Sequence, residues 1–565
     1  MEEKKRSAFE IVKENSNYLR GSIKESLAED TTHFTRKGET DLLKAHGTYQ
    51  QDDRDKRQDF VKQKKEPAYA MMVRSKIPGG RLSAGQYLNH DELATRFGNG
   101  TLRITTRQGF QLHGVLKKNL KAVIRGINEK LGTTLGACGD NVRNVMFCPA
   151  PLRDREKSDL WSTAKAVSDQ FLSQSGAYHE IWLNGEKVPE KKSQDPEPIY
   201  GKTYLPRKFK IAMAFPQDNC VDVYDHDIGI IPEMQNERPA GFNILVGGGL
   251  GMTHGIASTY PRLASPFCFV KADELLAITK AIVLVQRDYG NRADRKRARM
   301  KYLIDERGMD WFRQEVEKRF GKKTEPIHPF RLNEIDYHLG WHEEGGGRWF
   351  FGLSIENGRI LDQGNFRLKS GLRTAVKKFR PGVFLTAQQD ILLAGFKENQ
   401  KKELEDLLHA HGIKLPRELS SIQKFSMACP ALPTCGLAIA ESERLMPSLV
   451  DELEQKAAEL GLGDQKIMTR MTGCPNGCAR PYNAELAFVG RTIGTYNIYV
   501  GGSSIGDRMA FLYAEKVPDK QLVQKFFPLL SLYQKNRQPD EAFGDFCVRM
   551  GAEKLKASAE GLPII

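Results

Sequence analysis

The segments CPALPTC at residues 429–435 and TGCPNGC at residues 472–478 decide the interpretation of this 565-residue chain. They contain two cysteine pairs, Cys429 with Cys435 and Cys474 with Cys478, each in a turn sequence rich in Pro or Gly. Four thiolates of this kind suit one 4Fe-4S cluster. A structural zinc site is the alternative, although zinc-binding cysteines are usually about two to four residues apart. A third interpretation is a disulfide pair or four unrelated buried thiols, which turn sequences favour less.

Composition limits the class of protein. A chain of this length exceeds one hydrophobic core, and 40% hydrophobic with 28% charged residues is typical of globular domains. The N-terminus has no apolar run, and the longest apolar stretch, 275–285, is too short to cross a bilayer. We therefore expect a cytoplasmic protein whose nine cysteines stay reduced and available to metal. The formal charge of +14 indicates anionic partners.

The chain repeats itself internally. A shift of 281 residues superposes Thr105 on Thr386, Gln108 on Gln389 and Cys148 on Cys429, and a shift of 254 superposes 242–248 on 496–502. We infer duplication of a large α+β unit. The copies differ at the cysteines, because Asp154 stands where the second copy has Cys435. Cys220 lies 254 residues before Cys474, but Tyr224 replaces Cys478, so this match is interpreted as a coincidence.

The first half carries cations in or beside predicted strands: Arg74, Arg103, Arg107, Arg143, Arg207, Lys208 and Lys210. In KFKIAMAF (208–215), strand alternation places Lys208 and Lys210 on one face about 7 Å apart, where both ammonium groups face one anion. The alternative is a pair of solvated edge-strand lysines. Residues 1–70 are highly charged and predict an extended or helical arm.

Several motifs are absent from the sequence. No G-x-G-x-x-G, P-loop or C-x-x-C-H motif occurs, so no dinucleotide, P-loop or covalent c-type haem site is encoded. The basic segment NRADRKRARMKY (291–302) lacks interleaved aromatic residues. A zinc-stabilised, basic nucleic-acid-binding protein remains the non-enzyme alternative.

The cysteine segments, together with NYLRGSI (17–23), RQGFQLHG (107–114), NVRN (141–144) and GFNILVGGGL (241–250), resemble the sirohaem-containing nitrite and sulfite reductases. The resemblance covers nearly the whole chain and is strongest to haemoprotein (beta) subunits of assimilatory sulfite reductases. It implies an α+β, three-domain body built from a pseudo-twofold duplicated unit, with an N-terminal arm. The implied parts are the arm at 1–70, a ferredoxin-like half-domain pair at 71–135 plus 341–415, a first repeat with anion-binding cations at 136–340, and a second repeat with the cluster cysteines at 416–565.

The resemblance also implies roles for individual residues. Cys478 would bridge the cluster to the sirohaem iron. Substrate cations would be Arg74, Arg143, Lys208 and Lys210, and the sirohaem carboxylates would contact Arg103, Arg107 and Gln111. The implied reaction is the six-electron reduction of sulfite to sulfide in cysteine biosynthesis, with reduction of nitrite to ammonia as the alternative.

The electron donor is expected to be a separate protein, because no Rossmann fingerprint and no segment for a flavin domain remain in the sequence. The resemblance implies the flavoprotein (alpha) subunit of an NADPH-dependent sulfite reductase, with ferredoxin as the second candidate. An acidic donor would suit the positive charge of this chain.

Overall fold

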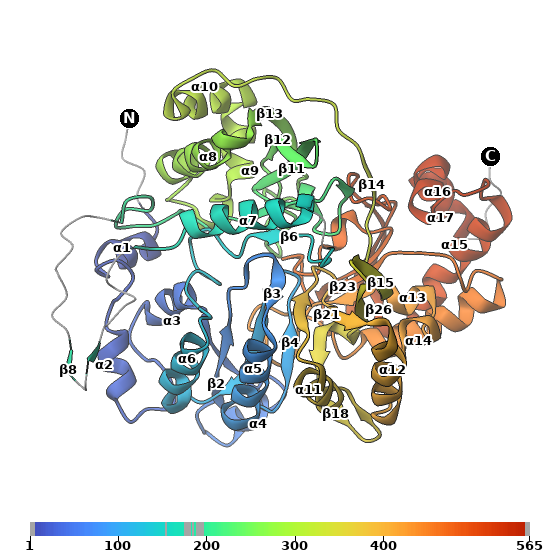
Figure 1. Cartoon of the computed structure of the whole chain (residues 1–565), viewed down its shortest axis with the longest axis horizontal. Coiled ribbons are helices and arrows are strands. Elements are labelled where there is room, and N and C mark those ends of the chain that lie inside the picture. The colour runs from blue at the N-terminus through green and yellow to red at the C-terminus, as the bar shows by residue number, and fades with distance from the viewer. Residues whose placement is uncertain (1–5, 153–154, 175–181, 184–185, 188–196, 560–565) are drawn as a thin grey trace.

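The computed structural model describes residues 6–152, 155–174, 182–183, 186–187 and 197–559. Helices and strands are mixed along the whole chain, as the α+β prediction requires (Figure 1). Four five-stranded sheets form the body, and three two-stranded sheets join outlying segments. The two-stranded pairs are β7 (Trp182–Leu183) with β8 (Glu186–Lys187), β10 (Gln217–Asp218) with β14 (Leu332–Glu334), and β18 (Asp362–Gln363) with β19 (Phe366–Arg367).

Two of the large sheets contain the segments predicted to form the ferredoxin-like half-domain pair. The first has the order β1-β2-β5-β4-β17 and the second has the order β15-β16-β21-β20-β3. The strands of the first are β1 (Thr48–Asp52), β2 (Tyr69–Arg74), β5 (Phe110–Val115), β4 (Leu102–Ile104) and β17 (Arg359–Ile360). Those of the second are β15 (Gly340–Gly345), β16 (Arg348–Leu353), β21 (Ile391–Lys397), β20 (Gly382–Leu385) and β3 (Arg81–Leu82).

The two halves exchange their edge strands. β3 lies in the first half of the sequence but pairs with β20, whereas β17 lies in the second half but pairs with β4. β5 and β21 begin at Phe110 and Ile391, which are 281 residues apart, as the sequence repeat predicts. Helices α5 (Ala84–Phe97) and α6 (Leu120–Glu129) share one hydrophobic core with their counterparts α11 (Leu368–Phe379) and α12 (Lys401–Ala410). The halves therefore fold as one unit.

The other two sheets form the repeats. Their orders are β13-β12-β11-β9-β6 and β22-β23-β24-β25-β26. In each, three strands run parallel and two antiparallel strands follow. The first contains β6 (Met146–Phe147), β9 (Ile211–Met213), β11 (Ile228–Gln235), β12 (Arg238–Val246) and β13 (Ser265–Lys271). The second contains β22 (Ser426–Ala428), β23 (Thr469–Thr472), β24 (Leu486–Thr492), β25 (Thr495–Val500) and β26 (Phe511–Pro518). The shared strand order confirms the duplication.

Helices cover each repeat and give it a core of its own. The first repeat carries α7 (Arg155–Gln170), α8 (Leu275–Tyr289), α9 (Met300–Arg307) and α10 (Met309–Phe320). The second carries α13 (Ser421–Lys424), α14 (Met446–Glu459), α15 (Leu522–Asn536), α16 (Phe543–Met550) and α17 (Ala552–Ala559). An extended segment after α10 runs from the first repeat to β15 (Figure 1). No described helix is long and apolar enough to span a bilayer.

The N-terminal segment packs against the body. It contains α1 (Ala8–Glu14), α2 (Ile23–Ala28), α3 (Glu39–Leu42), β1 and α4 (Arg57–Lys62). β1 pairs with β2, so part of the predicted arm belongs to the first ferredoxin-like sheet. Lys13 is buried between Glu10 and Asp140, with Nζ–O distances of 2.5 and 3.5 Å. The division of the chain into the four predicted parts stays a prediction.

The basic segment 291–302 is used inside the fold. Arg292 pairs with Glu10, and the Arg295 guanidinium binds both oxygens of Asp140 at 2.5 and 2.9 Å. Lys301 is fully buried and donates to the carbonyls of Gly249 and Gly251 at 2.7 and 3.1 Å. These cations join the arm and the loops of the first repeat, so the basic pattern does not indicate a nucleic-acid surface.

Candidate functional site

The predicted cluster cysteines lie at the ends of two neighbouring parallel strands. Cys429 directly follows β22, and Cys474 and Cys478 follow β23. Because the carboxyl ends of parallel strands meet at one edge of a sheet, both cysteine loops reach the same place. Burial, then the neighbouring charges of Cys478 and Cys435, raises the pKa of the Cys474 thiol to about 11. These thiols therefore share one environment.

The loops also supply donors to sulfur. The Gly473 backbone N–H donates to Cys429 Sγ at 3.4 Å, and the Asn476 side-chain amide donates to Cys474 Sγ at 3.5 Å. Such donors stabilise a thiolate that is bound to iron. Cys429 and Cys474 are buried, whereas Cys478 is exposed. Cys478 therefore has one side open to a further group.

The N-terminal arm holds the loop that carries Cys435. The Arg54 guanidinium donates to the carbonyl oxygens of Cys435 at 3.1 Å and of Ala438 at 2.5 Å. The Arg54 backbone N–H donates to the Pro433 carbonyl at 3.2 Å. Sequence reasoning missed this role, although Arg54 lies in the conspicuous segment GTYQQDDRD (47–55).

The predicted substrate cations meet where two segments pair through their backbones. The Arg143 N–H donates to the Phe209 carbonyl at 2.8 Å, and the Phe209 N–H donates to the Asn141 carbonyl at 3.1 Å. The strand predicted over 208–215 is shorter in the structure: β9 begins only at Ile211, so Lys208 and Lys210 lie in the segment just before it. This pairing sets the backbone of residues 208–210 beside that of residues 141–143.

Burial and neighbouring cations perturb both lysines. Burial, then the charges of Arg107 and Arg299, lower the pKa of Lys210 to about 7. Burial and the charges of Arg207 and Lys210 hold the pKa of Lys208 well below its usual range. The charge of Cys478 acts in the opposite direction and raises the pKa of both lysines.

Arg74 lies on the same side as Cys478. Arg74 Nη1 donates to Cys138 Sγ at 2.9 Å, and the charge of Cys478 also raises the Arg74 pKa. When the side-chain amide oxygen of Gln111 faces Arg74, it accepts a hydrogen bond from Arg74 Nε at 3.2 Å. The structure thus brings Arg74, Gln111 and Cys478 together.

The two arginines predicted to contact the sirohaem carboxylates, Arg103 and Arg107, differ in how fully their guanidinium groups are hydrogen-bonded within the protein. Arg103 is buried, and its guanidinium donates to Glu443 Oε2 and to the Ala428 carbonyl, both at 2.9 Å. Arg107 donates to the Asn144 carbonyl, but its buried Nε has no partner among the described residues. Burial and the charge of Arg143 lower the Arg107 pKa to about 9. Arg107 is therefore the better placed of the two to bind a cofactor carboxylate.

This region has more enclosed positive charge than the protein neutralises. In the part of the chain that the structure describes, the ammonium groups of Lys208 and Lys210 form no ion pair, and the pKa of Arg207 is lowered to about 10 by burial and nearby cations. These three cations are half-buried, and enclosed charges are normally paired, so the site favours an anionic occupant. A tetrapyrrole with several carboxylates, such as sirohaem, fits this requirement.

Sequence reasoning also missed Arg299. Its guanidinium binds both oxygens of Asp227 at 2.7 and 3.1 Å, and Asp227 accepts the Lys210 backbone N–H at 2.8 Å. Arg299 therefore fixes the segment that carries both lysines. Its sequence signal was the basic segment 291–302, but the pattern alone does not show which partner each cation has.

The comparisons with known proteins agree with this geometry. The nitrite and sulphite reductase 4Fe-4S domain family matches residues 162–324 and 426–562, and the nitrite/sulfite reductase ferredoxin-like half domain matches residues 62–130. The sulfite reductase (NADPH) hemoprotein beta-component of Staphylococcus saprophyticus is 45% identical over 543 residues, which cover 96% of this chain and 95% of the relative.

Two further relatives extend the comparison. The sulfite reductase (ferredoxin) of Synechococcus elongatus is 45% identical over 578 residues and covers 98% of this chain and 91% of its own length. The solved structure of the Mycobacterium tuberculosis NirA protein has a TM-score of 0.79 at 22% identity and covers 98% of both chains, which shows the same fold.

A duplicated α+β body in which two cysteine loops face a group of unpaired cations defines a redox enzyme with an iron–sulfur cluster and an anionic cofactor. The chain belongs to the nitrite and sulfite reductase family. Membership confirms the two expected cofactors, a 4Fe-4S cluster and sirohaem, and the oxidoreductase class. The residue assignments within the site stay predictions.

Proposed function

We propose that this enzyme reduces sulfite to sulfide with six electrons, as part of sulfate assimilation into cysteine. The observation that carries the proposal is that the exposed thiol of Cys478 interacts electrostatically with the pKa-perturbed cations Lys208, Lys210 and Arg74. The relatives named as sulfite reductases support this substrate. Cations beside the cluster ligand suit a small, doubly charged oxyanion.

Arg74, Arg143, Lys208 and Lys210 would bind this anion. Fixed positive groups in an enclosed site attract the substrate and offset the negative charge that each electron adds. The pKa of Lys210, about 7, also allows its ammonium group to donate a proton near neutral pH and to regain one from water. Protons are needed because every oxygen of sulfite leaves as water.

Cys429, Cys435, Cys474 and Cys478 would hold the cluster, and Arg103, Arg107 and Gln111 would contact the sirohaem carboxylates. The cluster and sirohaem would supply stored electrons and an iron atom that binds sulfur. Cys478 would serve both groups, since its sulfur has one exposed side. Arg54 and Gly473 would keep the cysteine loops in place.

The electron donor is proposed to be an NADPH-dependent flavoprotein. The relative from Staphylococcus saprophyticus is named as an NADPH hemoprotein beta-component, whereas that from Synechococcus elongatus is named as ferredoxin-dependent. Both relatives are 45% identical to this chain, so identity does not separate the two donors. The cytoplasmic location stays a prediction.

The proposal is tested with the purified chain and a chemically reduced dye. We expect sulfide to form from sulfite at six electrons per sulfide, with absorption bands of a tetrapyrrole in the protein. NADPH alone should support no turnover. If the chain turned over nitrite rapidly and sulfite negligibly, nitrite reduction would replace sulfite reduction as its function.

A further inference from the structure

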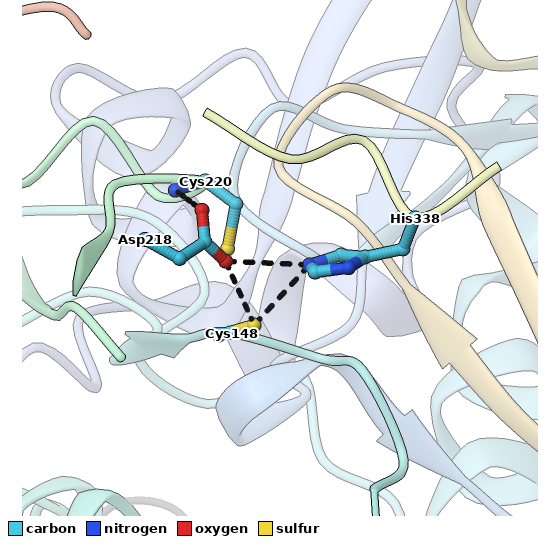
Figure 2. Close-up of side chains that lie close together, drawn as sticks. All are labelled: Cys148, Asp218, Cys220 and His338. Carbon is cyan, nitrogen blue, oxygen red and sulfur yellow. Dashed lines mark hydrogen bonds and ion pairs between the residues drawn. The ribbon is translucent and has the colours of Figure 1, made fainter. Parts of the chain in front are cut away.

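Four metal-ligating side chains outside the redox site converge in the first repeat (Figure 2). This first-repeat cluster consists of Cys148, Asp218, Cys220 and His338, and all four are at most 8% exposed. Cys148 follows β6, Asp218 ends β10, and His338 lies in the extended segment between β14 and β15. The cluster therefore joins three parts of the chain that are far apart in sequence.

Three of the four ligand atoms already have the spacing of a tetrahedral metal site, and the fourth lies close by. Cys148 Sγ lies 3.3 Å from His338 Nε2 and 3.4 Å from Asp218 Oδ2, and the latter two atoms are 3.4 Å apart. One ligand atom from each of the four residues, Cys220 included, lies within 4.8 Å of all the others. Bonds of about 2.0–2.3 Å to a tetrahedral zinc ion separate its ligand atoms by about 3.3–3.8 Å.

The ligands are held by further contacts. His338 Nδ1 lies 3.1 Å from Asp336 Oδ2, which leaves Nε2 facing the cluster. The second oxygen of Asp218 accepts the backbone N–H groups of Cys220 at 2.8 Å and of Asp336 at 3.2 Å. Carboxylates behind a ligating histidine and hydrogen bonds to a ligating carboxylate are typical supports of metal sites.

The composition of the cluster also points to a cation. The cluster buries Asp218 and two thiols with one histidine, and the partly exposed Asp336 lies behind that histidine. Burying a carboxylate beside two thiols is costly unless these groups are protonated, paired or bound to metal. Two sulfurs, an imidazole and a carboxylate match the preferences of zinc. A cavity of about 670 Å³ is lined in part by Cys148, Pro149 and Trp161, so it reaches one member of the cluster.

The duplication gives independent support. Cys148 follows β6 as Cys429 follows β22. The pairing of Ile211 with Ile228 in the first repeat corresponds to that of Thr469 with Leu486 in the second, which sets a shift of 258 residues for this region.

This shift superposes Cys220 on Cys478, and Asp222 on Arg480, both of which have left-handed backbones with φ of 51° and 53°. The match of Cys220 with Cys474 at the 254-residue shift is therefore a coincidence, because that shift applies only beyond the β11–β12 hairpin. That hairpin is four residues longer than β24–β25. Two cysteines of the first-repeat cluster thus occupy the places of two iron–sulfur ligands.

We propose that the first-repeat cluster binds one structural zinc ion. The ion would cross-link β6, the β10 loop and the segment that leads into the second ferredoxin-like half. The zinc site would occupy the position in the first repeat that the predicted iron–sulfur site occupies in the second. Its two sulfurs, imidazole and carboxylate suit zinc, which is redox-inactive. The first repeat would keep a metal where the second repeat keeps a cluster.

The first test is the metal content of the holoprotein after purification without added metal. We expect one zinc per chain in addition to the iron of the cofactors. X-ray absorption at the zinc edge should show two sulfur neighbours at about 2.3 Å and lighter neighbours at about 2.0–2.1 Å. Absence of zinc, or a zinc environment with only nitrogen and oxygen neighbours, would overturn the proposal.

The second test compares Cys148→Ser and Cys220→Ser with Cys268→Ser. Cys268 is equally buried in the first repeat but lies outside the cluster. We expect the two cluster variants to lose zinc and melt at a lower temperature while folded molecules retain sirohaem absorption, and Cys268→Ser to keep its zinc. The assignment is contradicted if both cluster variants retain zinc, or if Cys268→Ser loses as much zinc as they do. This conclusion does not depend on enzyme activity.

Discussion

At the scale of single residues, the site depends on lysines whose pKa is lowered, so that their positive charge is costly to keep. Lys210 is crowded by Arg107 and Arg299, and Lys208 by Arg207. Cations this close together repel one another and destabilise the folded protein until an anion lies among them. Binding of the anionic cofactor and substrate relieves this repulsion. Cys478 is the sulfur on which their fields converge.

Cys478→Ser should remove both the iron–sulfur and the tetrapyrrole signals, because this residue is proposed to serve both groups. Absorption and electron paramagnetic resonance spectra measure the two signals separately. Cys547→Ser, at a buried cysteine in α16, should leave both spectra unchanged. A Cys478→Ser protein with its full tetrapyrrole spectrum and sulfite turnover would disprove the shared-ligand role.

Lys210→Met should leave the spectra intact but lower sulfite turnover by about a hundredfold or more, the usual scale for a lost acid–base group. Wild-type turnover should decline as the pH rises above about 7, since Lys210 then loses its proton. The variant should have a flatter pH profile. Lys202→Met, at an exposed lysine nearby, is the control. Loss of the tetrapyrrole in Lys210→Met would reassign the residue to cofactor binding.

At the scale of elements, parallel strands explain why sequence-distant cysteines meet. β22 and β23 end side by side, so the loops after them lie at one sheet edge. The arm adds a third element, because Arg54 binds the carbonyls around Cys435. Edge-strand exchange through β3 and β17 fixes the two ferredoxin-like halves against each other.

Arg54→Ala should loosen the Cys435 loop by about 1–3 kcal/mol, since hydrogen bonds from a charged donor are lost. The expected result is a lower iron content per chain and faster loss of the cluster on exposure to air. Arg57→Ala, which breaks only the local pair with Asp52, should retain the cluster. Equal cluster stability in both variants would show that the arm does not support the loop.

At the scale of the whole molecule, the two repeats meet through a buried charge network. Asp222 of the first repeat accepts from Arg480 at 2.5 Å and from Arg470 at 3.0 Å, both in the second. Asp222 and Arg480 occupy equivalent positions, so the pseudo-twofold relation places an acid opposite a base. This pairing fixes the relative position of the repeats around the site.

The net charge of +14 predicts how the donor binds. Turnover driven by an acidic flavoprotein should fall as salt rises from about 0.1 to 1 M, because the screening length shrinks from about 10 to 3 Å. Turnover driven by a reduced dye should change little and serves as the control. Donor-driven turnover that is insensitive to salt would exclude electrostatic docking.

The sequence by itself determined the cysteine motifs, the α+β class, the duplication and the family, since turns and repeats are local or periodic patterns. Only the tertiary structure decided which partners the cations have. Arg54 contacts a carbonyl 381 residues away, and the basic segment 291–302 turned inward to bind Glu10 and Asp140. The sequence also did not predict the first-repeat cluster, because its four residues follow no regular spacing along the chain. Its four ligands meet only where β6, β10 and the segment before β15 pack together.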